Sequence, residues 1–421
     1  MKRHIVIVGN GVTGVTAARF IRKLSASQIT VISSETDHFY ARTALMYIYM
    51  GHMRYRETKP YEDHFWTQNG IGLVRGYVTH VDTARKVLHI ADGPEIAYDS
   101  LLLATGSQSS KFGWPGQNLP GVQGLYGIPD LVLMERYTRN ISRGVVVGGG
   151  LIGVEMAEML HARGIPVTFL VREDSYMDYL LPQKESRMIN EEICRHDIDL
   201  RLATELKAVK GTTRAEAVVT STGDEIVCQF VGLTVGVHPN IGLAQASGIA
   251  TRRGILVNEY FETSVPDVYA AGDCAEFNRD GIGSRRVEQL WYTGRAHGKT
   301  VAFTLCGMPR PYRRGVFFNS AKFFTIEYQT YGDVPAEPPG GIGTLCVTGN
   351  RKLLRINFDR QSGRVTGINV LGLRLRQDVC EAWIQGGAKI EDVAHQVNRA
   401  RFDTEFDPSF ARKVQRMFTQ A

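Results

Sequence analysis

Two glycine clusters in this chain of 421 residues have the spacing of a phosphate-binding turn. The six glycines, three to a cluster, are Gly9, Gly11 and Gly14, and Gly148, Gly150 and Gly153. In such a turn the first glycine permits the tight bend, the second lets the backbone approach a pyrophosphate, and the third lets a helix pack closely on a strand. The helix that follows supplies free N–H donors and a partial positive charge. The spacing therefore predicts two sites for dinucleotides.

Each glycine turn is followed by a helix and a second strand. The residues just after that strand help to decide which dinucleotide is bound. Glu35 lies beyond the first such strand, where a carboxylate accepts hydrogen bonds from a ribose 2′-hydroxyl. In the second copy the strand ends at Val171, and Arg172, Glu173 and Asp174 follow. An arginine there accommodates the 2′-phosphate of NADPH, whereas an acid favours NADH. The choice between these two dinucleotides stays open.

The elements that must hold the turns form two copies of one pattern. Each copy has a β-branched apolar run, the glycine cluster, a stretch of helix formers and a second apolar run. The segments are 4–8, 15–24 and 28–32 in the first copy, and 144–147, 154–163 and 166–171 in the second. Strand, helix and strand in this order predict parallel sheets and a doubly wound, Rossmann-like α/β fold.

Further segments extend this organisation. Short buried strands are expected at 101–106 and 268–273, and a helix at 287–305. Loops rich in proline and glycine at 309–315 and 335–343 are typical of boundaries or exposed connections. The pattern therefore indicates that the first dinucleotide domain resumes after the second.

We expect three domains. The first dinucleotide-binding domain is discontinuous, at 1–112 and 245–312, and the second covers 113–244. A C-terminal α+β domain is expected at 316–421, because the pattern changes there to strands followed by a helix, at 353–358, 365–371 and 376–385.

Composition excludes several classes of protein. Apolar side chains make up 43% of the chain and charged ones 22%, which excludes wholesale disorder. No uninterrupted apolar run is long enough to cross a bilayer and no secretory leader is recognised, so a cytoplasmic protein is expected. The six cysteines form no Cys-x-x-Cys pair and have no zinc-ligand spacing, so we expect reduced thiols and no metal site.

The net charge of +6 has two interpretations. One is a solvated surface with a small basic excess, since net charge concerns solubility and association rather than fold. The other is a docking face for an acidic partner, whose candidates are Arg310, Arg313, Arg314, Arg399, Arg401, Arg412, Lys413 and Arg416. No nucleic-acid motif accompanies these charges, so a nucleic-acid partner is not expected.

Two more motifs give the chain a resemblance to a known family. Residues 102–107 read Leu-Leu-Ala-Thr-Gly-Ser, and residues 268–274 read Val-Tyr-Ala-Ala-Gly-Asp-Cys. With the two glycine turns, and in this order, they resemble the two-dinucleotide-domain flavoprotein reductases of the pyridine nucleotide-disulfide oxidoreductase superfamily. The resemblance is good over 1–310 and loose over 316–400. It implies FAD in the first domain, NADH or NADPH in the second, and hydride transfer from nicotinamide to flavin N5.

The resemblance also implies roles for individual residues. Glu35 would bind the adenosine ribose of FAD, Val78 its adenine edge and Asp273 its ribityl or phosphate portion. The full set for FAD is Gly9, Gly11, Gly14, Glu35, Arg42, Val78, Thr105, Gly106 and Asp273. The set for the nicotinamide dinucleotide is Gly148, Gly150, Gly153, Glu155, Arg172 and Gly236.

Three residues are expected beside the reacting rings, and none of them is a covalent nucleophile. Arg42 would lie near the flavin, Glu155 near the nicotinamide, and Trp291 beside the isoalloxazine. Each has an ordinary alternative, namely an exposed arginine at a helix start, a carboxylate favoured by the helix dipole, and a tryptophan of the core.

The segment 39–45 distinguishes the branches of the family. Disulfide reductases carry redox cysteines here, and NADH oxidases and coenzyme A-disulfide reductases carry one at the place of Thr43. No cysteine occurs before position 194, and a thiolate is the nucleophile of thiol–disulfide exchange. Tyr40, Arg42 and Leu45 instead resemble the ferredoxin-reductase and nitrite-reductase branch. We therefore expect no disulfide reduction at this place.

The expected electron acceptor is a small iron–sulfur protein such as a ferredoxin or rubredoxin. A quinone or oxygen is the alternative among enzymes, and a flavin-containing redox sensor is the alternative of another class. The resemblance of the C-terminal domain implies a homodimer. Late apolar residues have helical spacing and fit packing onto that domain better than contact with a membrane surface: Phe406, Phe410, Val414, Met417 and Phe418.

Overall fold

The computed structural model describes residues 2–278, 287–402 and 412–416. The chain divides into two compact units. The first unit comprises Met1–Ser110, Gly124–Glu135 and Gly236–Arg314, and the second comprises Lys111–Gln123, Arg136–Val235 and Gly315–Ala421. Residues 124–135 and 236–244 thus group with the first dinucleotide module, and the C-terminal part groups with the second. The three domain boundaries stay a prediction.

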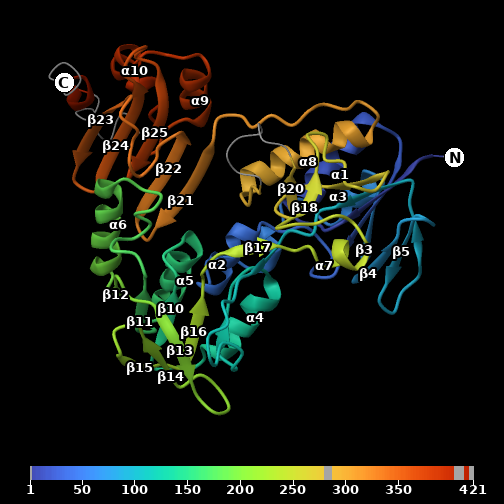
Figure 1. Ribbon diagram of the computed structural model, residues 1–421, viewed down its shortest axis with the longest axis horizontal. Coiled ribbons are helices and arrows are strands. Elements are labelled where there is room, and N and C mark those ends of the chain that lie inside the picture. The colour runs from blue at the N-terminus through green and yellow to red at the C-terminus, as the bar shows by residue number, and fades with distance from the viewer. Residues whose placement is uncertain (1, 279–286, 403–411, 417–421) are drawn as a thin grey trace. The chain divides into compact units, whose positions relative to one another are not determined.

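The first unit is built on a five-stranded parallel sheet in the order β19-β7-β1-β2-β3. Its strands are β1 (His4–Val8), β2 (Gln28–Ser33), β3 (Ile71–Arg75), β7 (Ser100–Leu103) and β19 (Val268–Ala270). Helix α1 (Val12–Leu24) joins β1 to β2, and α8 (Trp291–Leu305) packs along α1 (Figure 1). Helix α8 begins four residues later than the expected 287, because Leu290 is extended.

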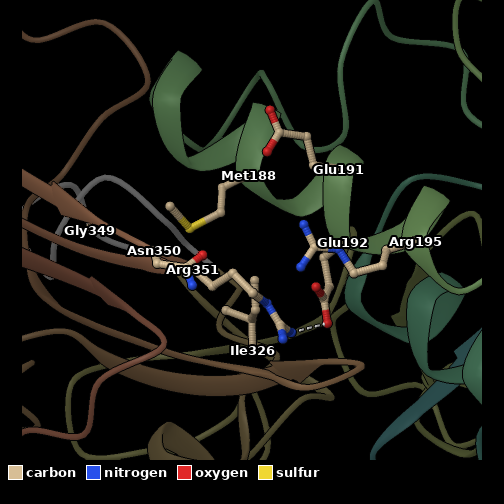
Figure 2. Close-up of a pocket in the computed structure, with 8 residues that line it drawn as sticks. All are labelled: Met188, Glu191, Glu192, Arg195, Ile326, Gly349, Asn350 and Arg351. Atoms are coloured by element: carbon tan, nitrogen blue, oxygen red, sulfur yellow. Dashed lines mark hydrogen bonds and ion pairs between the residues drawn. The ribbon is translucent and has the colours of Figure 1, made fainter.

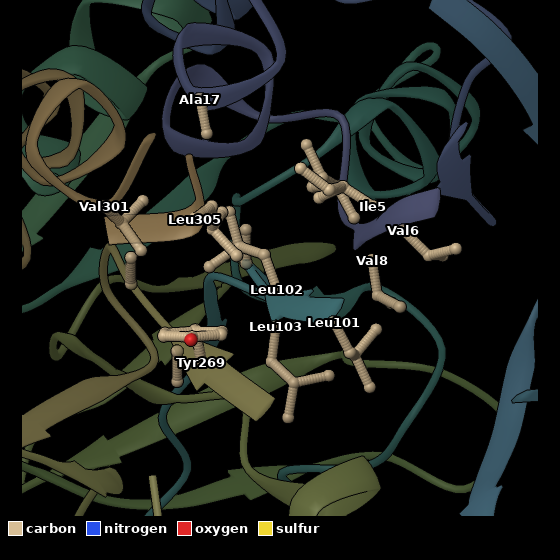
Figure 3. Packing of buried hydrophobic residues seen from close by; sticks show 14 of the residues in the cluster. Ile5, Val6, Val8, Ala17, Leu101, Leu102, Leu103, Tyr269, Val301 and Leu305 are labelled. Atoms are coloured by element: carbon tan, nitrogen blue, oxygen red, sulfur yellow. The ribbon is translucent and has the colours of Figure 1, made fainter. Parts of the chain in front are cut away.

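The core of the first unit lies between this sheet and its helices. Strands β1 and β7 carry continuous apolar runs, as parallel strands buried on both faces do. Figure 3 shows Leu102 of β7 on the side of Ala17 of α1 and Val301 of α8, and Leu101 and Leu103 on the opposite side of the strand. All five residues are completely buried. Each such large side chain stabilises the fold by about 1.5–3 kcal/mol relative to an exposed one.

Smaller elements surround this sheet. Strands β4, β5 and β6 form an antiparallel meander, β8 pairs antiparallel with β17, and β18 pairs parallel with β20. Their bounds, with those of the short helices, are η1 (Arg42–Ala44), α2 (Leu45–Tyr49), η2 (Tyr55–Thr58), α3 (His64–Gln68), β4 (Val78–Asp82), β5 (Val87–Ile90), β6 (Ile96–Ala97), β8 (Ser107–Ser109), α4 (Ile128–Tyr137), β17 (Val237–Pro239), α7 (Gly242–Ala246), β18 (Ile255–Val257) and β20 (Ala275–Phe277).

The second unit repeats the parallel design. Its sheet has the order β12-β11-β10-β16-β9, with all four pairings parallel, and helix α5 joins β10 to β11. The elements are β9 (Val122–Gln123), β10 (Gly144–Val147), α5 (Leu151–Ala162), β11 (Val167–Leu170), α6 (Gln183–Arg195), β12 (Asp199–Arg201) and β16 (Phe230–Leu233), with an antiparallel sheet of β13 (Leu206–Lys210), β14 (Ala217–Thr220) and β15 (Glu225–Val227). The expected doubly wound α/β class is confirmed.

The C-terminal part of the second unit is an antiparallel sheet in the order β21-β22-β25-β24-β23. Helix α9 packs on β22 and β25, and β21 contacts α5 and α6. The elements are β21 (Phe318–Phe323), β22 (Ile326–Gly332), β23 (Ile342–Gly349), β24 (Lys352–Asp359), β25 (Val365–Leu371), α9 (Gln377–Gln385), α10 (Ile390–His395) and η3 (Val397–Arg399).

Two predictions from the sequence remain: that the late apolar residues pack onto the C-terminal domain, and that no segment crosses a bilayer. Of the late apolar residues, Val414 is buried, which agrees with packing, whereas Phe406, Phe410, Met417 and Phe418 lie outside the described residues. Among the helices of the described ranges, none has both the length and the hydropathy that a bilayer crossing requires.

Candidate dinucleotide sites

The first glycine turn leaves open space where its second glycine lies. Gly9 has a φ of +114°, and a Cβ there would lie 2.1 Å from the carbonyl oxygen of Ala104. A Cβ on Gly14 would lie 2.0 Å from the carbonyl oxygen of Gly9, so the third glycine permits the contact of helix with turn. A Cβ on Gly11 would meet nothing within 4 Å. No side chain caps α1 at Gly11, so the helix start is free to face a phosphate.

The second turn has the same geometry. Gly148 has a φ of +112°, and a Cβ on Gly153 would lie 2.2 Å from the carbonyl oxygen of Gly148. A Cβ on Gly150 would meet only the carbonyl oxygen of Thr234, at 3.9 Å. No side chain caps α5 at Gly150. Both turns thus combine a closely packed third glycine with an open second glycine at a helix N-terminus, which is the shape that a pyrophosphate requires.

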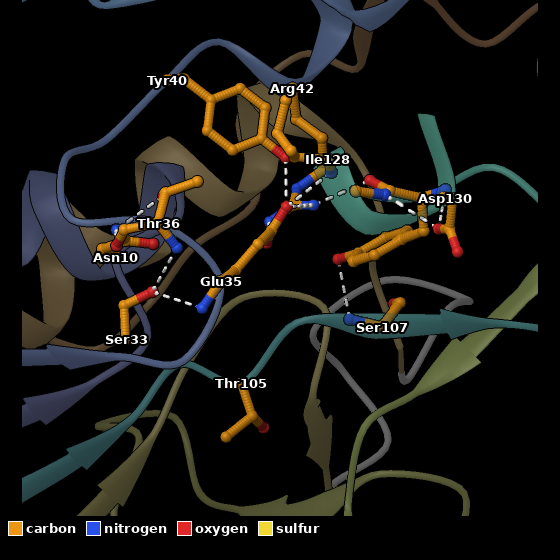
Figure 4. A network of polar contacts seen from close by, with 12 residues as sticks. Asn10, Ser33, Glu35, Thr36, Tyr40, Arg42, Thr105, Ser107, Ile128 and Asp130 are labelled. Carbon is orange, nitrogen blue, oxygen red and sulfur yellow. Dashed lines mark hydrogen bonds and ion pairs between the residues drawn. The ribbon is translucent and has the colours of Figure 1, made fainter. Parts of the chain in front are cut away.

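Glu35 lies past β2 in a network of polar contacts (Figure 4). Its Oε1 accepts hydrogen bonds from Tyr40, from Arg42 Nη1 at 3.1 Å and from the Ile128 N–H at 2.9 Å, and its Oε2 accepts one from Arg42 Nη2 at 2.7 Å. Burial opposes ionisation of Glu35, but the charge and hydrogen bonds of Arg42 outweigh it, so its pKa lies below the usual value. Each carboxylate oxygen has about two lone pairs, so Oε2 can accept one hydrogen bond beyond that from Arg42.

Arg42 is half-buried and contacts Tyr126. Its guanidinium donates to the carbonyl oxygen of Tyr126 at 2.8 Å and lies over the Tyr126 ring, 4.6 Å from the centroid. Asp130 accepts hydrogen bonds from the N–H groups of Tyr126 and Gly127, at 2.7 and 3.0 Å. Arg42 is therefore held by Glu35 and Tyr126 rather than free at a helix start, and its role toward the flavin stays a prediction.

No reactive thiol lies in the described part of the first unit. The assignment of Thr43 to the place of the redox cysteine stays a prediction, and the cysteines of this unit are Cys274 and Cys306. Cys274 is completely buried, and burial raises the pKa of both thiols. A thiol with a raised pKa carries little thiolate and is a poor nucleophile.

Residues of the two later flavin motifs meet through Ser107. Its hydroxyl donates to Asp273 Oδ2 at 3.2 Å and accepts from Gln289 Nε2 at 2.8 Å. Burial raises the pKa of Asp273. Trp291 is partly exposed at the start of α8, beside Tyr292. The structure thus brings Asp273 and the start of α8 together around Ser107.

The other residues expected at FAD lie in the same unit. Thr105 donates to the carbonyl oxygen of Asn240 at 2.7 Å. Gly106 has a φ of +71°, and a Cβ there would lie 2.6 Å from the Tyr126 hydroxyl. Val78 is buried in β4. The roles of these residues toward FAD stay predictions.

Glu155 lies on the first turns of α5 and belongs to a pair of carboxylates. Glu158, one turn further on, accepts a hydrogen bond at Oε1 from Lys322 Nζ at 2.6 Å. Burial, with the charge of Glu158, raises the pKa of Glu155 to about 7. Tyr176 is completely buried and donates to the carbonyl oxygen of Gly150 at 2.8 Å, so it fixes the second turn.

The strand-end residues Arg172 and Glu173 pair with each other. Arg172 is exposed and donates from Nε to Glu173 Oε1 at 2.8 Å. The other oxygen of Glu173 would lie 3.5 Å from a Cβ at Gly149, so this carboxylate lies next to the second glycine turn. Gly236 groups with the first unit, where its carbonyl oxygen accepts the Ser110 N–H at 3.0 Å.

A cavity of about 210 Å³ lies elsewhere in the second unit. Figure 2 shows Glu192 and Arg351 inside it as an ion pair, with 2.6 Å between Oε1 and Nη2. Its lining residues are Met188, Glu191, Glu192, Arg195, Ile326, Gly349, Asn350 and Arg351. None of these lining residues belongs to either glycine turn. The cavity is therefore separate from the two candidate dinucleotide sites.

Two of the arginines proposed for docking are less exposed than Arg310 and Arg313. Arg401 is buried, and Arg314 lies with its Nε 3.2 Å from Glu288 Oε1. Arg401 is therefore not available to a docking face, whereas Arg314 is half-buried and stays a candidate. Arg310 and Arg313 are exposed.

Comparison with known proteins identifies the family. Residues 3–298 match the family described as pyridine nucleotide-disulphide oxidoreductase. The chain belongs to this family. Its members use FAD and NADH, so the expected cofactors are confirmed, and the two open glycine turns fit two dinucleotides.

Two similar proteins are named as reductases. The chain is 31% identical over 337 residues to the nitrite reductase [NAD(P)H] of Bacillus subtilis (strain 168), covering 79% of this chain but only 41% of that protein. It thus spans about two fifths of that relative's length. It is 29% identical over 291 residues to the ferredoxin–NAD(+) reductase subunit of the benzene 1,2-dioxygenase system of Pseudomonas putida, covering 68% and 71% of the two chains.

A solved structure supports the fold. The ferredoxin reductase for the CYP199A2 system from Rhodopseudomonas palustris superposes with a TM-score of 0.79 at 24% identity, covering 88% of this chain and 91% of that one. The expected resemblance to the ferredoxin-reductase and nitrite-reductase branch is confirmed by these relatives.

Sequence reasoning missed several contacts around the sites. Tyr126 and Asp130 lie in a segment assigned to the second domain, and no motif marks them. Tyr176 and Lys322 reach the second glycine turn and helix α5 from distant parts of the sequence.

Proposed function

We propose that this protein is a FAD-dependent NAD(P)H oxidoreductase that passes electrons to a small iron–sulfur protein. The observation that carries the proposal is the family's pair of dinucleotide turns combined with Thr43 in place of a redox cysteine. Without a thiolate at that place, electrons must leave the flavin directly for an external acceptor. The ferredoxin named for two of the similar proteins supports the choice of acceptor.

The chain's own residues have the following parts in this reaction. The turns at Gly11 and Gly150 hold the two pyrophosphates through backbone N–H groups. Glu35 holds the ribose end of FAD, and Arg42 fixes Glu35. Asp273 holds the ribityl or phosphate portion. Bound FAD would supply the hydride-accepting group, and these residues would supply its orientation and electrostatics.

The acceptor is tested by reoxidation. The protein is reduced with NADH without oxygen and then mixed with a ferredoxin, a quinone or oxygen. We expect the ferredoxin to reoxidise the flavin fastest, at a rate that falls with added salt because Arg310 and Arg313 attract an acidic partner. Faster reoxidation by quinone or oxygen would show that the acceptor is not an iron–sulfur protein. A reduced flavin that persists with every acceptor would favour a redox sensor.

We also propose a preference for NADH over NADPH. Glu173 lies beside the second glycine turn, where its carboxylate can accept from a ribose 2′-hydroxyl and repels a 2′-phosphate. Replacing Glu173 by alanine leaves Arg172 without its partner. The ratio of kcat/KM for NADH to that for NADPH is then expected to fall about tenfold or more, by about 1.4 kcal/mol.

The control for this change is Asp174→Asn, which removes the neighbouring exposed acid. Steady-state kinetics with both coenzymes should leave the Asp174→Asn ratio near that of the unchanged protein. An unaltered ratio in Glu173→Ala would refute the role of Glu173. A cytoplasmic location and a homodimer stay predictions.

A further inference from the structure

Helix α5 carries two neighbouring carboxylates, and one of them pairs with a lysine of the C-terminal sheet. Glu155 and Glu158 are three residues apart, so their Cβ atoms lie about 5–6 Å from each other on the helix. Lys322 of β21 pairs with Glu158 Oε1, and the Glu158 side chain is only 10% exposed. Glu158 Oε2 is buried without a hydrogen-bond partner among the described residues. One cation therefore offsets two neighbouring charges.

The charged and titratable groups that act on Glu155 come from three elements. Glu158 lies on the same helix, and its charge opposes ionisation of Glu155. Lys322 comes from β21, and its charge favours ionisation. Tyr176 comes from the segment after β11 and stays protonated, because burial holds its pKa well above the usual value. Burial has the largest effect on the pKa of Glu155, and the charges of Glu158 and Lys322 act on it in opposite directions.

We propose that Lys322 is a positioning residue of the nicotinamide site, which by pairing with Glu158 allows Glu155 to be ionised when the dinucleotide binds. The inference rests on the proposed function and on the role that the family resemblance implies for Glu155, beside the nicotinamide ring. An ionised carboxylate there favours the positively charged oxidised ring over the neutral reduced one. The C-terminal sheet thereby sets a property of the nicotinamide site through one ion pair.

The pH dependence follows from the direction of the shift. The pKa of Glu155 is raised to about 7, so this carboxyl is protonated below that pH and ionised above it. Affinity for NAD⁺ is expected to rise with pH through this region, by about fivefold for a partly exposed charge. Removing Lys322 raises the midpoint further, because Glu158 then acts on Glu155 without its counter-charge.

The experiment measures NAD⁺ binding to the FAD-loaded protein by calorimetry at a series of pH values around 7. Lys322→Met is expected to move the midpoint up by about one pH unit and Glu158→Gln to move it down by a similar amount. The Lys322→Met, Glu158→Gln double variant should return close to the original midpoint. Lys322→Arg should leave it unchanged, and Lys207→Met is the matched control, since it removes an exposed Lys–Glu pair of the same unit.

A second measurement follows the protonation of Glu155 in protein to which no nicotinamide dinucleotide has been added. The infrared band of a protonated carboxyl group is followed against pH, and Glu155→Gln identifies the contribution of this residue. If the infrared midpoint is the same in Lys322→Met and Glu158→Gln as in the unchanged protein, the proposal is overturned. If the infrared midpoint moves and NAD⁺ binding does not follow it, the link to the nicotinamide site is overturned.

The two proposals fail in different ways. If the unchanged protein does not bind NAD⁺ at any pH, the proposed function itself is contradicted. If it binds NAD⁺ with an affinity that is independent of pH, only the inference about Lys322 fails. Should Lys322→Met not fold, Glu158→Gln still tests the inference through the opposite shift.

Discussion

Replacement of Gly11 by valine is expected to give a folded protein that purifies without FAD. A Cβ at Gly11 meets no protein atom within 4 Å, and the backbone there is extended with a φ of −70°, which valine adopts readily. The added methyl groups instead occupy the space that a pyrophosphate needs. Losing two hydrogen bonds to a charged group costs about 3 kcal/mol or more, so FAD affinity should fall about 100-fold or more.

Gly14→Val is the comparison that separates binding from folding. A Cβ at Gly14 would lie 2.0 Å from the carbonyl oxygen of Gly9, and backbone atoms cannot move aside as a flexible side chain can. We expect this variant to be insoluble or strongly destabilised. Circular dichroism and flavin absorbance of the two variants give the test. A yellow Gly11→Val protein with normal FAD content would contradict the assignment of the first turn.

Replacement of Gly150 by valine is expected to keep FAD and lose NADH. The backbone at Gly150 is extended, and its nearest contact to an added Cβ is at 3.9 Å, so the second unit should fold normally. The first turn is unchanged, so the protein should be yellow. The Kd for NADH should rise about 100-fold or more, for the same reason as at Gly11.

Reduction of the Gly150→Val flavin separates the two sites. NADH should bleach it far more slowly than in the unchanged protein, whereas a chemical reductant such as dithionite should bleach both equally. Equal bleaching by NADH would show that the second turn does not bind the nicotinamide dinucleotide. Together with Gly11→Val, this result assigns one dinucleotide to each turn.

The parts of the fold that could be predicted are those in which local sequence determines structure. The apolar runs at β1 and β10 and the glycine spacing after them predict a strand, a turn and a helix within about twenty residues. The parallel sheets follow because each strand returns through a helix. The sequence alone likewise shows that position 43 is a threonine and that no cysteine precedes Cys194.

The contacts that fix the sites could not be predicted, because they join residues far apart in the chain. Arg42 and Tyr126 are 84 residues apart, and Lys322 and Glu158 are 164 apart. Neither pair leaves a periodic pattern or a motif. The role of Glu155 shows the same limit, since its place on α5 was predictable but its raised pKa depends on Glu158 and the C-terminal sheet.

The central claim is that this protein holds FAD and a nicotinamide dinucleotide so that hydride passes between them. Its most direct test is anaerobic mixing of the purified, FAD-loaded protein with NADH carrying deuterium at C4. The account predicts bleaching of the flavin within milliseconds to seconds, and slower bleaching with the deuterated coenzyme than with the ordinary one. A colourless protein that cannot be reconstituted with FAD, or a bound flavin that NADH and NADPH leave oxidised, would contradict it.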